Sequence, residues 1–171
     1  MSLDKPPLAR PIEAKIAWAE ACRDPLKEAL ENAPRLTAMI ARFREAVEAS
    51  RREMAATGIV RLCRQCEEDE GGSCCGEGLE NRYDPWLLLI NLLLGVPLPH
   101  SRRRAGSCYF LGDSGCLLSA RHTICLNYIC AKITDRVDPE KISRLREREG
   151  VELDALFLLH EEVKGVVRRL T

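Results

Sequence analysis

Cysteine is concentrated in two short stretches of this chain, and that distribution restricts its fold more than any other feature. Eight of the nine cysteines lie in residues 63–75 and 108–130, and Cys22 alone stands apart. The clustered cysteines are Cys63, Cys66, Cys74, Cys75, Cys108, Cys116, Cys125 and Cys130. Thiolates at this density usually hold a metal ion or a metal–sulfur cluster. The sequence therefore predicts these eight side chains as metal ligands in an irregular cysteine-rich core.

The compartment of the protein decides how its cysteines are interpreted. The first residues, Met-Ser-Leu-Asp-Lys-Pro-Pro, lack the apolar core and the cleavage site of a secretory signal. Disulfides are disfavoured in a reducing cytosol, and an odd number of cysteines fits a closed disulfide framework poorly. The strongest apolar run, residues 86–94, is too short to cross a bilayer. We therefore expect a cytoplasmic protein with no membrane partner.

Charge and motifs exclude several function classes. Lys and Arg number 26, as do Asp and Glu, whereas a dedicated nucleic-acid binder normally carries a basic excess. The short basic run at residues 102–104 is interpreted as a solvated loop. We find no glycine loop for a nucleotide or methyl donor, no nucleophile elbow and no HExxH motif. A metal-binding protein is thus favoured over an enzyme, and nucleic acid is not an expected partner.

Helical spacing of apolar residues predicts a mostly α fold with at most one short β-hairpin. Residues 1–58 are expected to form a helical N-terminal extension, either a scaffold or a face for a protein partner. Within it, Asp24-Pro25 should end one helix and begin another, and Gly58 should end the helix over residues 34–57. Cys22 lies on a helix face and is interpreted as a small core residue.

Residues 59–171 are predicted to form a cysteine-cluster metal-binding domain with C-terminal helices. Its expected elements are a cysteine-rich loop over residues 59–78, a buried core helix over 86–94 that begins at Asp84-Pro85, a hairpin around 112–115, a partly helical segment over 119–132, a helix from Asp138-Pro139 to Gly150, and a last helix over 151–169.

The spacing of the cysteines leaves the type of metal site open. Cys63 and Cys66 have the CxxC spacing at which a tight turn aims two sulfurs at one ion. Adjacent side chains such as Cys74 and Cys75 point in different directions, so they suit two neighbouring metals or two irons of one cluster better than one tetrahedral ion. Eight thiolates allow up to two zinc sites, whereas one four-iron cluster would use four of them.

A buried metal–thiolate group carries net negative charge and needs cations or backbone donors nearby. Arg121, between Cys116 and Cys125, is the residue that we expect to neutralise or hydrogen-bond such a centre or cofactor. A surface arginine is the alternative interpretation. His122 is a candidate replacement for one cysteine ligand, whereas His100 and His160 are interpreted as ordinary surface or helix residues.

One ordered pattern combines these residues: Cys63-Arg-Gln-Cys66, Ser73-Cys74-Cys75-Gly76, Cys108-Tyr-Phe-Leu111, Gly115-Cys116, Arg121, Cys125 and Tyr128-Ile-Cys130. This pattern, over residues 60–131, resembles the cysteine-cluster family of zinc- or iron-chelating proteins. The resemblance implies chelation of zinc or iron and no established reaction. The alternative function is an iron–sulfur electron-transfer module, or an accessory part of a redox or transferase enzyme.

Overall fold

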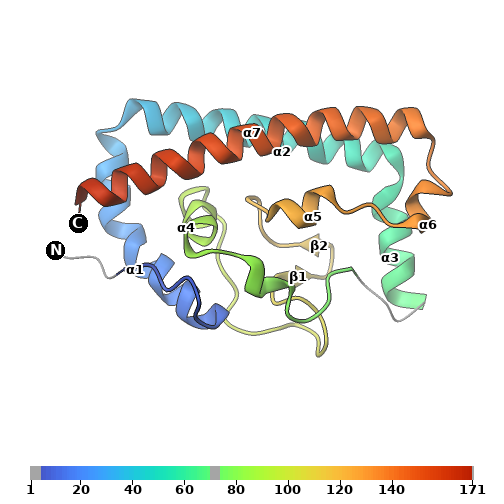
Figure 1. Cartoon of the computed structure of the whole chain (residues 1–171), viewed down its shortest axis with the longest axis horizontal. Helices are drawn as coiled ribbons and strands as arrows, with labels where there is room; N and C mark the ends of the chain where they lie inside the picture. Colours follow the sequence, from blue (N-terminus) through green and yellow to red (C-terminus); the bar gives the residue numbers. More distant parts are fainter. Residues whose placement is uncertain (1–4, 70–73, 171) are drawn as a thin grey trace.

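The computed structural model describes residues 5–69 and 74–170, and they form a mostly helical protein (Figure 1). The elements in chain order are α1 (Ile12–Glu31), α2 (Pro34–Thr57), α3 (Ile59–Asp69), the 3-10 helix η1 (Leu79–Arg82), α4 (Pro85–Leu93), β1 (Leu111–Gly112), β2 (Gly115–Cys116), α5 (Thr123–Asn127), α6 (Ala131–Thr134) and α7 (Pro139–Leu170). β1 and β2 pair antiparallel as the expected hairpin. The prediction of a mostly α fold with a short hairpin is confirmed for this part of the chain.

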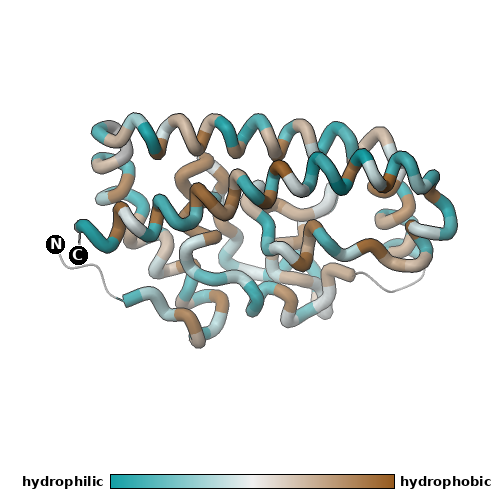
Figure 2. Tube along the Cα trace, turned by 45° about the horizontal axis from the view of Figure 1, so that its top comes forward, coloured by the Kyte–Doolittle hydropathy of each residue, from teal (hydrophilic) through white to brown (hydrophobic). Residues whose placement is uncertain are grey.

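The two longest helices, α2 and α7, run antiparallel and side by side along the molecule (Figure 1). Apolar and polar residues alternate along both helices (Figure 2), and both helices contribute buried apolar residues to the core. Phe43 of α2 and Leu159 of α7 are completely buried. Full burial of such a side chain contributes about 1.5–3 kcal/mol. This pair forms one layer of the fold.

The prediction that Gly150 ends a helix is wrong, because α7 continues through it as one helix. A glycine inside a helix costs only about 1 kcal/mol relative to alanine. Leu145 before it and Leu156 after it are both buried, and Glu149 beside it is buried and bound to Arg146. Burial on both sides of Gly150 outweighs the cost of the glycine.

The predicted break at Asp24-Pro25 is also wrong, because α1 passes through Pro25 as a single helix. Proline inside a helix removes a hydrogen bond and costs about 3 kcal/mol. The buried face of α1 continues across it, however, from Ala19 and Cys22 to Leu26. This face packs on α4, where Trp18 and Trp86 make an edge-to-face contact with 4.7 Å between ring centroids. Cys22 is confirmed as a core residue.

Helix α4 is the predicted core helix. Leu88, Leu89 and Ile90 are fully buried. Asp84 caps its N-terminus, since its Oδ1 accepts a hydrogen bond of 2.8 Å from the Leu87 backbone N–H. Pro85 occupies the first turn, where a backbone N–H would have no acceptor within the helix, so proline's lack of one costs nothing. The predicted start of this helix is therefore confirmed.

The buried apolar residues form two separate cores, and clustered cysteines pack against each of them. The larger core contains residues of α1, α2, α4 and α7 together with the segment around residues 108–120. The smaller core lies where α3, α6 and the beginning of α7 meet, and it contains Ile59, Ile133, Val137 and Leu145. Gly58 ends α2 in the left-handed conformation, as predicted. The predicted boundary between the N-terminal extension and the cysteine-cluster domain falls at this residue, and helices on both sides of it contribute to the larger core. A protein partner on the N-terminal helices stays a prediction.

Candidate functional site

The first two clustered cysteines lie on a helix rather than in the predicted loop. Residues 59–69 form α3, which carries Cys63 and Cys66, while residues 70–73 of the expected loop lie outside the described residues. Positions three apart share one face of a helix, so both thiols project from the same side of α3. Ile59 and Leu62 of α3 pack in the smaller core. This packing explains why the segment is helical although it carries a CxxC pattern.

Four cysteines gather beside α3, and we call Cys63, Cys66, Cys74 and Cys130 the outer cluster. Burial raises the pKa of the Cys63 thiol, and the other three cysteines raise it further through their charge. Burial and the charges of Cys130 and Cys66 likewise raise the pKa of Cys74, whose thiol is hydrogen-bonded to that of Cys130. Lys132 Nζ donates a hydrogen bond of 3.4 Å to Cys66 Sγ. Residues 66 positions apart in sequence therefore meet here.

The other four clustered cysteines lie against the larger core, and we call Cys75, Cys108, Cys116 and Cys125 the inner cluster. Burial raises the pKa of Cys108 to about 11, and the charges of Cys116 and Cys125 act in the same direction. The Cys108 backbone N–H donates a hydrogen bond of 2.6 Å to the Cys75 carbonyl. The inner cluster thus joins the loop after α3, the hairpin and α5.

Tyr83 is a member of this site that the sequence did not reveal. Its hydroxyl lies 3.6 Å from Cys125 Sγ, and its ring packs edge-on against Phe110. Burial raises the pKa of Tyr83 well above its ordinary value. Nothing in the spacing of the cysteines points to a tyrosine that precedes a core helix in the chain.

Arg121 is buried beside the inner cluster, so the surface interpretation of this residue is wrong. Burial raises the pKa of Cys116 and of Cys125, and the guanidinium of Arg121 opposes that rise in both thiols. On its other side, Arg121 Nη2 lies 3.5 Å from Glu152 Oε1 of α7. Among the described residues, Arg121 Nε and Glu152 Oε2 have no hydrogen-bond partner. Arg121 therefore lies between thiols and a buried carboxylate.

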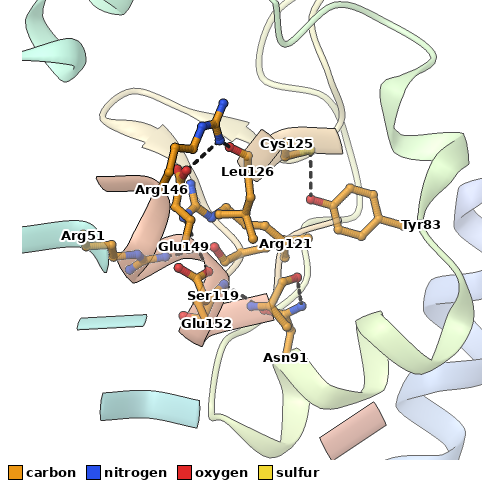
Figure 3. A network of polar contacts seen from close by, with 12 residues as sticks. Arg51, Tyr83, Asn91, Ser119, Arg121, Cys125, Leu126, Arg146, Glu149 and Glu152 are labelled. Atoms are coloured by element: carbon orange, nitrogen blue, oxygen red, sulfur yellow. Dashed lines mark hydrogen bonds and ion pairs between the residues drawn. The ribbon is translucent and has the colours of Figure 1, made fainter. Parts of the chain in front are cut away.

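A network of polar contacts fixes the segment that carries Arg121 and Cys125 (Figure 3). The Asn91 side chain of α4 accepts from the backbone N–H groups of Ser119 and Ala120 and donates to the Ala120 carbonyl. Arg146 of α7 donates to the carbonyl of Leu126 and to Glu149. The segment is thus held from both sides, by α4 and by α7.

Buried Glu80 of η1 fixes the loops that carry the other inner cysteines. Its carboxylate accepts from the backbone N–H groups of Gly78 and Tyr109 and from the Arg102 side chain. Arg102 also donates a hydrogen bond of 2.6 Å to the Ser107 carbonyl. These contacts hold the segment after Cys75 against the segment before Cys108.

The basic run at residues 102–104 is paired residue by residue rather than simply solvated. Arg102 binds Glu80, Arg103 forms an ion pair with Asp113 of the hairpin turn, and Arg104 binds Glu67 of α3 at 2.9 Å. The run therefore links three segments around the cysteines.

The three histidines make other contacts. The imidazole of His122 caps α5, because its Nδ1 accepts from the Ile124 backbone N–H at 3.2 Å. His160 Nε2 lies 3.1 Å from Asp84, and His100 Nε2 lies 3.1 Å from Glu20. A ligand role for His122 would have to use its other ring nitrogen.

Cys63, Cys74, Cys108, Cys116, Cys125 and Cys130 form no disulfide. Within residues 5–69 and 74–170, no group of three or more His, Cys, Asp or Glu side chains is arranged so that it could hold a metal ion. The donor chemistry nevertheless fits a soft metal, because sulfur is the ligand that zinc, copper(I) and iron–sulfur clusters prefer. The described cysteines therefore offer sulfur donors but no arrangement that could coordinate a metal ion.

Comparison with protein-family models, with curated proteins and with solved structures found no match to this chain. The resemblance to the cysteine-cluster family stays a prediction. Among the described helices, none is long and apolar enough to span a membrane.

Proposed function

We propose that this chain is a metal-binding protein that chelates zinc or iron through the thiolates of its two cysteine clusters. The observation that carries the proposal is that cysteines from segments far apart in sequence lie close together, as Cys63, Cys66, Cys74 and Cys130 do in one group and Cys108, Cys116 and Cys125 in the other. A fold that kept these thiols only as small apolar residues would have no reason to group them. Thiolate is a soft ligand that selects zinc or iron–sulfur clusters over magnesium and calcium.

The charges around both clusters support the same proposal. A metal ion bound by several thiolates carries net negative charge, which is costly to bury without cations. Arg121 is buried beside the inner cluster, and the charge of Arg51 also acts on Cys116. Lys132 contacts Cys66 of the outer cluster. Each cluster therefore has a cation placed where ligation would generate negative charge.

Metal binding would complete a geometry that the thiols alone do not adopt. Protonated thiols attract one another only weakly, so nothing draws their sulfurs together. In a zinc site each sulfur lies about 2.3 Å from the ion. A bound ion would draw the sulfurs inward and release their protons. Zinc would then act as a cross-link between segments, whereas an iron–sulfur cluster would also allow electron transfer.

The test is metal analysis of the full chain purified without air, together with its visible absorbance. We expect stoichiometric zinc without colour, or iron with acid-labile sulfide and a broad visible band; the second result would favour the electron-transfer alternative. The variants Cys66→Ser and Cys125→Ser should each contain less metal. Cys22→Ala is the matched control, because Cys22 packs in the core of α1 and α4, and it should keep the full content. Full occupancy in both serine variants, or no metal in the wild type, would refute the proposal.

A further inference from the structure

The two cysteine clusters differ in their exposure. Cys63 and Cys74 of the outer cluster are exposed, and Cys66 and Cys130 are half-buried. In the inner cluster Cys108 is only 6% exposed, and Cys75, Cys116 and Cys125 are half-buried against the larger core. The outer cluster therefore offers two exposed cysteines to an incoming ligand, whereas none of the inner cysteines is exposed and Cys108 is buried.

The clusters also belong to different packing units. Cys130 packs in the smaller core, with Ile59 and Leu62 of the helix that carries Cys63 and Cys66. The inner cysteines pack against the larger core, which is built on α1, α2, α4 and α7. Motion of the smaller core can therefore change the outer cluster while the inner cluster stays in place.

The adjacent pair Cys74 and Cys75 lies at the boundary between these units. The Cys74 thiol is hydrogen-bonded to Cys130 of the outer cluster. Cys75 packs on the larger core, and its carbonyl accepts the backbone N–H of Cys108. One cysteine of the pair therefore belongs to each cluster, which gives four sulfurs to each.

We propose that the chain holds two metal ions at separate sites: an inner ion bound by Cys75, Cys108, Cys116 and Cys125 that stabilises the fold, and an outer ion bound by Cys63, Cys66, Cys74 and Cys130 that is exchangeable cargo. This inference rests on the proposed metal binding. Four sulfurs are the full ligand set of a closed tetrahedral zinc site. The exposed ligands of the outer ion let a competing chelator or thiol attack it directly, so its exchange needs no opening of the larger core.

The test uses the full chain loaded with Zn²⁺ without air and then mixed with excess EDTA, with zinc release followed over time. We expect about two zinc ions per chain, released in two phases of equal size that differ by about tenfold or more in rate. The variant Cys74→Ser should lose the fast phase and keep the slow one. Its neighbour Cys75→Ser is the matched variant and should lose the slow phase and keep the fast one.

The outcomes separate this inference from the function on which it rests. A single ion per chain, a single release phase, or loss of the same phase in both variants would overturn the two-site inference while leaving metal binding intact. No bound zinc at all would overturn both. If Cys75→Ser does not fold, the wild type and Cys74→Ser decide the matter, because the exposed Cys74 thiol tolerates replacement and must remove only the fast phase.

Discussion

Among the single residues of the site, Arg121 is a buried cation that is paired with a buried carboxylate. Its side chain is 10% exposed and that of its partner Glu152 is completely buried, at 3.5 Å. Removal of one member of a buried ion pair leaves the other charge uncompensated, which typically costs about 3–5 kcal/mol. Arg121 therefore connects the stability of α7 to the inner cluster.

We expect Arg121→Leu to lower the free energy of unfolding by about 3 kcal/mol, because the carboxylate of Glu152 stays buried without its cation. The double variant with Glu152→Leu should recover part of that loss, since it buries neither charge. Urea unfolding of the two single variants and the double variant measures the coupling. Additive losses would show that Arg121 and Glu152 do not interact.

Glu149 gives the fold a pH dependence. Burial raises the pKa of this carboxyl above its ordinary value, against the opposing effect of Arg146. A carboxyl whose pKa is higher in the folded chain stabilises fully below its unfolded pKa, and this contribution is lost as the pH rises through the folded pKa. We expect metal-free Glu149→Gln to lose less unfolding free energy than the wild type as the pH rises above about 4.5. Parallel pH profiles of the two proteins in urea unfolding would contradict this.

At the scale of elements, sequence patterns predicted helices well where burial and capping agree. The start of α4 at Asp84-Pro85 and the end of α2 at Gly58 are local signals, and both are confirmed. Pro25 and Gly150 are local signals too, yet both lie inside helices. Whether the helix continues through each of these residues depends on the packing of α1 against α4 and of α7 against α2. The spacing of residues along the chain does not reveal this packing. The loop predicted over residues 59–78 is wrong for residues 59–69, which form α3 because Ile59 and Leu62 pack in the smaller core.

The continuity of α7 leads to a prediction at Gly150. An added Cβ there meets nothing within 4 Å, and its backbone is not left-handed. We expect Gly150→Ala to stabilise the protein by about 0.5–1 kcal/mol, because alanine has less conformational freedom to lose in a helix. Gly58→Ala is the matched control: at φ 82° it should destabilise by about 1–2 kcal/mol. Thermal unfolding compares both with the wild type, and a destabilising Gly150→Ala would place a helix end at that residue.

At the scale of the whole molecule, metal removal should act unevenly. The α2–α7 pair and α4 are regular helices packed by apolar residues, whereas the segments around residues 74–76 and 107–130 are mostly irregular and combine apolar packing with polar contacts to Glu80 and Asn91. We expect treatment with a chelator to speed amide hydrogen exchange at least about tenfold in those cysteine segments while α2 and α7 change little. Equal protection of the cysteine segments with and without metal would show that the ions do not hold them.

The candidate site was only partly predictable. The eight cysteines and Arg121 stand out in the sequence because their residue types and spacing indicate ligation. The division into two clusters could not be predicted from the sequence, because it depends on α3 being a helix and on which core each thiol faces. Tyr83, Glu80, Asn91 and Arg146 were missed altogether. They bind the cysteine segments from positions distant in sequence, and no local sequence pattern indicates such contacts.

X-ray absorption spectroscopy at the metal edge should show whether these cysteines hold the metal, because it identifies the atoms bound to the metal in the intact chain. For zinc, we expect nearest neighbours that are all sulfur, about four per ion, at about 2.3 Å. Iron in a sulfide cluster would likewise show sulfur neighbours only. Nearest neighbours dominated by oxygen or nitrogen at about 2.0–2.2 Å would refute ligation by cysteine, because the ion would then not be held by these thiolates.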